Sequence, residues 1–125
     1  MQSIGLGLTG LAGAGILIIG LLYLLRPLAI ASSFGFTAIL ESGQETWLRV
    51  KGVRDATCGL VAFVLLLTAP PAVIGWVLLT FALIPLGDAA NVIGSRGHAR
   101  AAWAIHVPTA TLMLIGAILL LMGSR

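Results

Sequence analysis

The chain has 125 residues, of which 59% are hydrophobic and 9% are charged. Soluble domains contain about 25% charged residues, so this composition excludes an ordinary soluble domain and predicts one small integral membrane domain over residues 1–125. The net charge of +3 does not indicate nucleic-acid binding, because the basic residues lie at predicted helix ends and not in one patch. The lone cysteine, Cys58, excludes an internal disulfide and a Cys-x-x-Cys redox pair.

The first predicted membrane span covers about residues 4–25 and ends at Arg26-Pro27. No basic region precedes it, so we expect a retained span and not a cleaved leader. Its glycines recur at helical spacings, as in Gly5 and Gly13 or Gly7 and Gly15, and small residues on one face allow close helix packing in lipid. The connection after it, residues 28–48, is apolar and then polar, which predicts a short interfacial helix followed by a turn.

Residues 56–87 form a run without a charged side chain, broken only by Pro70-Pro71. A bilayer-spanning helix takes about 20 residues, so the run is too long for one span and too short for two. Two helices that turn at the proline pair, about residues 48–69 and 71–93, must therefore extend into the polar residues on both sides. Because the turn is short, we expect these two helices to be antiparallel neighbours.

A fourth span is predicted over about residues 101–122, with a bend at Pro108. Four spans predict an all-α protein, specifically an antiparallel four-helix bundle in the membrane. The positive-inside rule places the basic face in the cytoplasm and both termini outside, in what we expect to be a bacterial inner membrane. The basic face contains every lysine and arginine except Arg125, namely Arg26, Arg49, Lys51, Arg54, Arg96 and Arg100.

Ionisable residues of three different spans are predicted to lie at one depth. Counting about 1.5 Å per residue from the opposite face puts Asp55, Asp88 and His106 about 21 to 26 Å from it, within a hydrocarbon slab about 30 Å thick. Arg54 falls in the same layer. Lys51 is four residues from Asp55 and is expected to pair with it, which leaves Arg54 to reach Asp88 across the bundle.

This polar layer forms a set suited to acid–base catalysis. We assign catalytic roles to Asp88, His106, Asp55, Arg54 and Asn91, with the histidine shuttling protons and the amide placing water. The expected substrate is a lipophilic small molecule that arrives from the bilayer and undergoes epoxide opening or hydrolysis, isomerisation or cyclisation. The side chains expected to line its binding site are those of Trp103, Cys58, Phe81 and Thr109.

A purely structural interpretation is left open. In it, Arg54 neutralises Asp88, Lys51 extends to water at the interface, and Cys58 only packs. Two further alternatives are a small-molecule transporter or exporter and a quinone-binding or accessory subunit assembled through the Gly-rich first helix. Neither a metal-ligand cluster nor a phosphate-binding loop is present in the sequence, so no metal ion and no cofactor are expected. Membrane lipid is the expected surrounding, and a homo-oligomer is left open.

The same residues carry a resemblance to a known family. Lys51-Gly52-Val53-Arg54-Asp55, then Gly87-Asp88 and His106, resemble a family of small four-helix membrane proteins of unknown function that is loosely similar to DoxX-like proteins. The resemblance covers nearly the whole chain. It implies the four-helix architecture and marks Arg54, Asp55, Asp88 and His106 as positions of interest, and it implies no activity.

Overall fold

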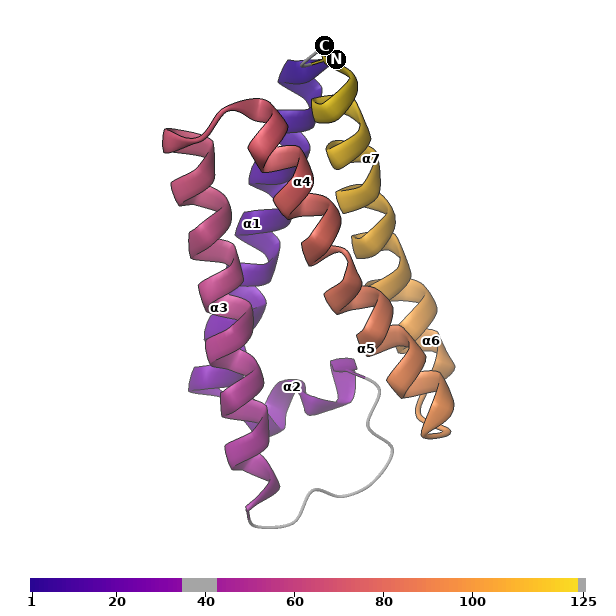
Figure 1. Ribbon diagram of the computed structural model, residues 1–125. Helices are drawn as coiled ribbons and strands as arrows, with labels where there is room; N and C mark the ends of the chain where they lie inside the picture. Colours follow the sequence, from indigo (N-terminus) through magenta and orange to yellow (C-terminus); the bar gives the residue numbers. More distant parts are fainter. Residues whose placement is uncertain (35–42, 124–125) are drawn as a thin grey trace.

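The computed structural model describes residues 1–34 and 43–123, and every regular element in them is a helix. The all-α prediction is therefore confirmed for this part of the chain. The segments 2–25, 44–68, 71–94 and 99–123 run lengthwise, and the short helix 27–34 lies across one end of the molecule (Figure 1). The elements are α1 (Gln2–Leu25), α2 (Pro27–Phe34), α3 (Gln44–Thr68), α4 (Pro71–Phe81), α5 (Leu83–Gly94), α6 (Ala99–Ala101), the π-helical turn η1 (Ala102–His106) and α7 (Val107–Gly123).

Three helical segments are long and apolar enough to cross a membrane: Gln2–Leu25, Pro71–Gly94 and Ala99–Gly123. Their length and composition indicate a membrane protein. The helix α3 has 25 residues, which is also long enough, but it contains Lys51, Arg54 and Asp55. With these three charges, α3 is not among the segments that qualify by composition.

The helices α1 and α3 pack along each other at close range. A Cβ atom added to Gly20 would lie 2.3 Å from the backbone nitrogen of Ala56, and one added to Gly59 would lie 2.8 Å from the carbonyl oxygen of Gly13. Side chains larger than hydrogen do not fit at such approaches. The close packing predicted for the first span is thus confirmed at Gly13 and Gly20, and its partner is α3. The prediction also placed Gly7 and Gly15 on the packing face, and this part is wrong, because no atom lies within 4 Å of a Cβ added to either.

A second pair forms from α4 and α7. Added Cβ atoms would lie 2.9 Å from Leu121 Cγ at Gly75 and 3.0 Å from Leu78 Cδ2 at Gly116. The helices that flank Pro70-Pro71, predicted as antiparallel neighbours, are in contact near the turn but are not packed closely along their length. Among the described residues α3 reaches α5 through side chains, with Arg54 Nη2 3.2 Å from Asp88 Oδ2, while the close helix contacts are those of α1 with α3 and of α4 with α7 (Figure 1).

Two prolines distort the helices that face α1 and α3. Pro85 has no N–H to donate to the carbonyl of Phe81, and the helix is interrupted at Ala82, between α4 and α5. Pro108 likewise leaves the carbonyl of Ala104 without its helical partner, and the turn before it is the π-helical η1. The disturbance predicted at Pro108 is therefore present as a wide turn that ends at His106, while the interruption caused by Pro85 was not predicted.

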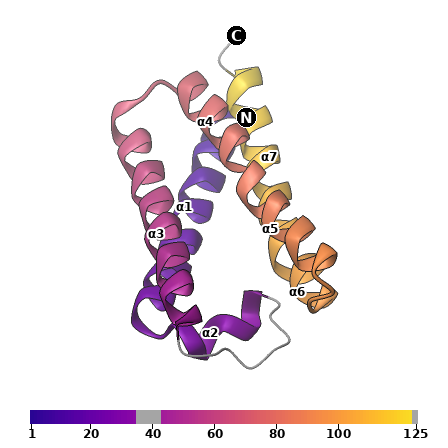
Figure 2. The same cartoon turned by 60° about the horizontal axis from the view of Figure 1, so that its bottom comes forward.

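The short helix α2 lies across the end of the molecule opposite to the termini, as Figures 1 and 2 show. It begins at Pro27, whose missing N–H does no harm in a first turn. Phe34, its last residue, packs against Tyr23 and Leu48 on one side and against Ala89 and neighbouring residues of α5 and η1 on the other. The predicted short helix is thus confirmed, and it connects the two helix pairs. The turn predicted to follow it falls largely on residues 35–42, outside the described part.

Candidate functional site

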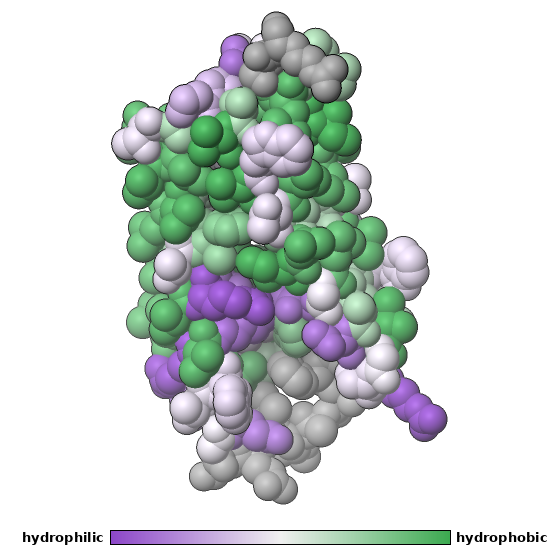
Figure 3. Space-filling model, viewed as in Figure 1, coloured by the Kyte–Doolittle hydropathy of each residue, from purple (hydrophilic) through white to green (hydrophobic). Residues whose placement is uncertain are grey.

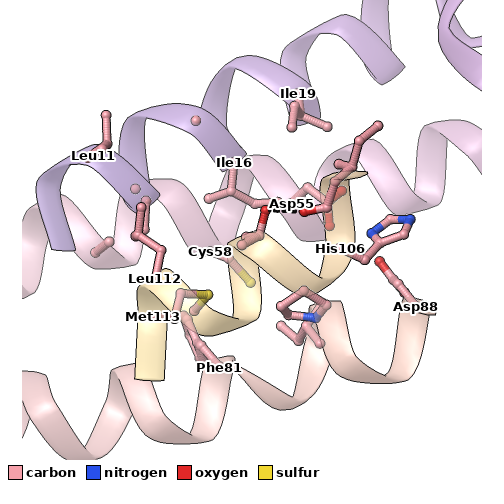
Figure 4. Close-up of a pocket in the computed structure, with 18 of the residues that line it drawn as sticks. Leu11, Ile16, Ile19, Asp55, Cys58, Phe81, Asp88, His106, Leu112 and Met113 are labelled. Carbon is pink, nitrogen blue, oxygen red and sulfur yellow. Dashed lines mark hydrogen bonds between the residues drawn. The ribbon is translucent and has the colours of Figure 1, made fainter. Parts of the chain in front are cut away.

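A cavity of about 480 Å³ lies between the α1–α3 pair and the segments α4, α5, η1 and α7. Figure 4 shows Leu11, Leu112 and Met113 at one end of it and Asp88 and His106 at the other. Leu11, at the apolar end, is 61% exposed. The cavity therefore has an apolar body and a polar end.

Two cations and two carboxylates form the charged cluster, which we define as Lys51, Arg54, Asp55 and Asp88. Lys51 Nζ and Arg54 Nε both donate to the Asp55 carboxylate, the arginine at 2.9 Å. Arg54 Nη2 also donates to Asp88 Oδ2 at 3.2 Å, and Lys51 Nζ lies 3.8 Å from the same oxygen. The two pairs expected from the sequence, Lys51 with Asp55 and Arg54 with Asp88, are confirmed. The formal charge of the cluster is zero.

The four members differ in their exposure. The Asp55 side chain is 1% exposed and that of Arg54 is 42% exposed, with Lys51 at 14% and Asp88 at 13%. Both Asp55 oxygens are engaged, Oδ2 by lysine and Oδ1 by arginine. Both cations reach Asp88 through Oδ2, and Oδ1 makes no hydrogen bond to the described residues. Asp55 therefore holds the two cations in place, and Asp88 has an oxygen left for a ligand.

The Lys51 ammonium lies inside the protein, beside two aromatic rings. Its nitrogen is 4.9 Å from the ring centroid of Tyr23 and 4.9 Å from that of Phe34. Aromatic faces attract a cation at such distances. The interpretation that Lys51 extends to water is therefore wrong: two rings and two carboxylates hold it at the polar end of the cavity. Sequence reasoning did not assign Lys51, Tyr23 or Phe34 to the site.

The arrangement around His106 defines which ring nitrogen carries a proton. His106 Nε2 lies 3.3 Å from the carbonyl oxygen of Phe34, and the two aromatic rings meet edge to face at 5.0 Å. Phe34 is the last residue of α2, where the carbonyls of a helix accept hydrogen bonds from groups outside it. Because a carbonyl only accepts, Nε2 is the donor in this hydrogen bond, and in a neutral imidazole Nδ1 then has the lone pair.

The second ring nitrogen of His106 is Nδ1, and the residue forms part of the cavity wall. Nδ1 makes no hydrogen bond to the described residues. Every side-chain nitrogen or oxygen that is sealed from solvent in this part of the chain has a hydrogen-bond partner, so Nδ1 is not sealed. His106 itself lines the cavity, as does Asp88 (Figure 4). Nδ1 of His106 and Oδ1 of Asp88 are thus two acceptors available to a bound molecule, and the Lys51 ammonium is the nearby donor.

The structure brings most of the sequence-predicted residues to this place, but not all. Cys58, Phe81 and Thr109 line the cavity together with Asp55, Asp88 and His106. Trp103 is 65% exposed and Asn91 is exposed as well, and neither lines the cavity. Arg54 belongs to the charged cluster without lining the cavity.

The outer surface near the cluster differs from the rest of the visible face. Figure 3 shows a patch of hydrophilic side chains between α3 and α5, in the half of the molecule nearer α2, with hydrophobic surface extending from it toward the termini. Arg54 belongs to α3 and is the most exposed member of the charged cluster, and its guanidinium bonds to Asp88 of α5. Arg54 therefore connects the polar end of the cavity with the outer surface.

Comparison with known proteins places the chain in a family without supplying an activity. Residues 13–120 match the family model described as a domain of unknown function, DUF4267, and the chain belongs to this family. This agrees with the resemblance to a family of unknown function, whereas the relation to DoxX-like proteins stays a prediction. Neither a curated protein nor a solved structure matches the chain.

Proposed function

We propose that this DUF4267 protein is a membrane-embedded enzyme that carries out acid–base chemistry on a lipophilic small molecule. One observation carries the proposal: His106, with Nδ1 available to accept a proton, lies at the polar end of an otherwise apolar cavity. Ligand sites commonly combine an apolar pocket with a few convergent polar groups. Epoxide opening or hydrolysis, isomerisation and cyclisation all require the movement of a proton that such a histidine provides.

In the proposed mechanism, His106 is the general base. Its Nδ1 lone pair takes a proton either from a carbon next to the substrate's oxygen function or from a water molecule bound beside it. In the first case the electron pair of the broken C–H bond moves toward the carbonyl oxygen of the substrate. In the second case the water oxygen bonds to one carbon of an epoxide, the C–O bond of that carbon breaks, and its electron pair remains on the former ring oxygen. The Lys51 ammonium hydrogen-bonds that oxygen and stabilises the developing negative charge. The protonated imidazole then returns the proton to the product.

The remaining members of the cluster have supporting roles in this proposal. Asp88 lies at the same end of the cavity as His106, where its charge stabilises the imidazolium that forms. Asp55 is a positioning residue, because both of its oxygens are occupied by Lys51 and Arg54. Phe34 is a second positioning residue, since its carbonyl sets the tautomer of His106 and its ring contacts the Lys51 ammonium.

We further propose that α3 is a fourth membrane crossing, which makes the protein an antiparallel four-helix bundle. Its length supports this, because 25 residues span about 37 Å at a rise of about 1.5 Å each. Its charges at Lys51, Arg54 and Asp55 are paired and not left alone in lipid. With Arg26, Arg49, Arg96 and Arg100 near the α2 end, the positive-inside rule favours a cytoplasmic α2 end and external termini in a bacterial inner membrane.

The alternatives differ in how well the packing supports them. An accessory subunit assembled through the glycines of the first helix is less well supported at Gly13 and Gly20, which pack against α3, than at Gly7 and Gly15, which have open space beside them. A transporter of lipophilic molecules shares the requirement for a cavity with the proposed enzyme. The two are distinguished by whether covalent bonds of the bound molecule change.

Isotope incorporation tests for such a change without knowledge of the substrate. Membranes that contain the protein are incubated with a lipid extract in D2O, or in water labelled with oxygen-18, and lipophilic products are analysed by mass spectrometry. The proposal predicts label in at least one product, and a loss of about 10² to 10⁴-fold in the variant His106→Gln. Label is expected to persist in His98→Gln, which changes the exposed second histidine. Equal labelling in both variants, with His106→Gln folded and inserted, would contradict the proposal.

A further inference from the structure

We infer that the cavity takes an uncharged molecule with one oxygen function at one end of an apolar body, and that charged amphiphiles are excluded. This inference rests on the proposed function, since it names the substrate class for the same site. Three features support it: the charge balance of the cluster, the distribution of donors and acceptors, and the volume of the cavity.

The charge balance argues for a neutral head group. Lys51 and Arg54 contribute two positive charges, and Asp55 and Asp88 contribute two negative ones, with each carboxylate contacting both cations. A charged ligand group would leave one charge unpaired beside an apolar cavity, which is strongly unfavourable. A neutral oxygen function adds hydrogen bonds without disturbing the balance.

The available donors and acceptors match such an oxygen. Lys51 Nζ lies at the polar end and donates, while His106 Nδ1 and Asp88 Oδ1 make no hydrogen bond to the described residues and accept. A hydroxyl oxygen accepts from the ammonium and donates to either acceptor. A carbonyl or epoxide oxygen accepts from the ammonium in the same position. The shared requirement is one uncharged oxygen.

The size and shape of the cavity describe the rest of the molecule. At the packing density of about 0.74 found in protein interiors, about 480 Å³ holds about 350 Å³ of van der Waals volume, on the order of 20 non-hydrogen atoms. Apart from the polar end, the walls are mostly apolar, as at Ile16, Leu112 and Met113. The rest of the ligand is therefore an apolar body of about this size.

Cys58 provides a readout of occupancy that does not depend on catalysis. It is the only cysteine of the chain and it lines the cavity. The protein is placed in lipid nanodiscs, and the rate of Cys58 labelling by N-ethylmaleimide is measured with three probes at equal fractions in the lipid. The probes are dodecan-1-ol, dodecanesulfonate and dodecyltrimethylammonium, which share a chain and differ in the charge of the head group.

The inference predicts that dodecan-1-ol slows labelling by on the order of tenfold at ten times its dissociation constant, because only the empty fraction reacts. The two charged probes leave the rate unchanged. The variant Gly15→Leu places a side chain at the cavity wall and abolishes the protection, while Gly7→Leu preserves it. Both glycines lie on α1 with open space around an added Cβ, and of the two only Gly15 lines the cavity.

Protection by either charged probe equal to that by dodecan-1-ol overturns the inference. Protection that survives in Gly15→Leu also overturns it, because the alkanol is then bound elsewhere. Selective protection by dodecan-1-ol without any isotope incorporation by the protein upholds the inference and counts against the proposed enzyme alone. Turnover of a charged amphiphile upholds the enzyme and overturns the inference.

Discussion

Replacing Asp55 by asparagine is expected to destabilise the protein far more than the same change at Asp88. Asp55 is 1% exposed and accepts hydrogen bonds from Lys51 and Arg54 on its two oxygens. An asparagine presents an NH2 group to one of these donors and leaves that cation facing another donor. Removal of one partner of a buried ion pair costs about 3 to 5 kcal/mol.

Asp88 is the matched control, because it contacts the same two cations with weaker geometry. Its distances are 3.2 Å to Arg54 and 3.8 Å to Lys51. After its loss Asp55 still contacts both cations, and the one excess positive charge is shared with Arg54, whose side chain is 42% exposed to solvent. Asp88→Asn is therefore expected to cost about 1 kcal/mol or less in stability. Its effect falls on activity, because the oxygen that faces the cavity loses its charge.

The comparison is made by thermal unfolding in detergent, followed by the loss of helical circular dichroism. The melting temperature should fall by about 10 to 20 °C in Asp55→Asn and by about 5 °C or less in Asp88→Asn. Equal shifts, or a larger shift in Asp88→Asn, would refute the division of the cluster into a positioning carboxylate and a ligand-facing one.

Two further predictions follow from packing and exposure. Gly20→Ala should destabilise the protein by about 1 to 3 kcal/mol in the same melt, because the new Cβ would lie 2.3 Å from the backbone nitrogen of Ala56. Gly7→Ala should stabilise the protein by about 0.5 to 1 kcal/mol, because no atom lies within 4 Å of the new Cβ and alanine favours the helix. Equal melting temperatures would contradict the α1–α3 contact. Asn91→Ala and Trp103→Ala should leave isotope incorporation within about twofold of the unsubstituted protein, since both side chains are exposed outside the cavity. A loss of about tenfold or more in either would place that residue in the site after all.

The sequence was sufficient to predict the pairs that depend on helical spacing and depth. Lys51 with Asp55 is a spacing of four on one helix, and Arg54 with Asp88 follows from equal depth on two helices. The contact between α1 and α3 could also have been predicted from the sequence. Gly13 and Gly20 are seven residues apart, as are Gly52 and Gly59 on the partner helix. Chain connectivity was given more weight than this match, so the closer contact of α3 with α1 was not predicted.

Other features required tertiary structure. A lysine near a helix end normally extends to water, and only the placement of α2 brings the ring of Phe34 over Lys51. The same placement brings the Phe34 carbonyl to His106, a partner 72 residues away in sequence. The interruption at Pro85 did not require tertiary structure. A proline cannot donate a hydrogen bond to the carbonyl four residues earlier, and this rule alone would have placed the interruption after Phe81.

The most direct test of the central claim is nitrogen-15 NMR of histidine-labelled protein in lipid bilayers at neutral pH, with the variant His98→Gln used to assign the His106 signals. The proposed base requires a neutral imidazole with a proton on Nε2 and none on Nδ1, and a change in the Nδ1 signal when dodecan-1-ol is added. A proton on Nδ1 with a bare Nε2, or an Nδ1 signal that does not respond to the alkanol, would contradict the assignment of His106 as the base at the polar end of the cavity.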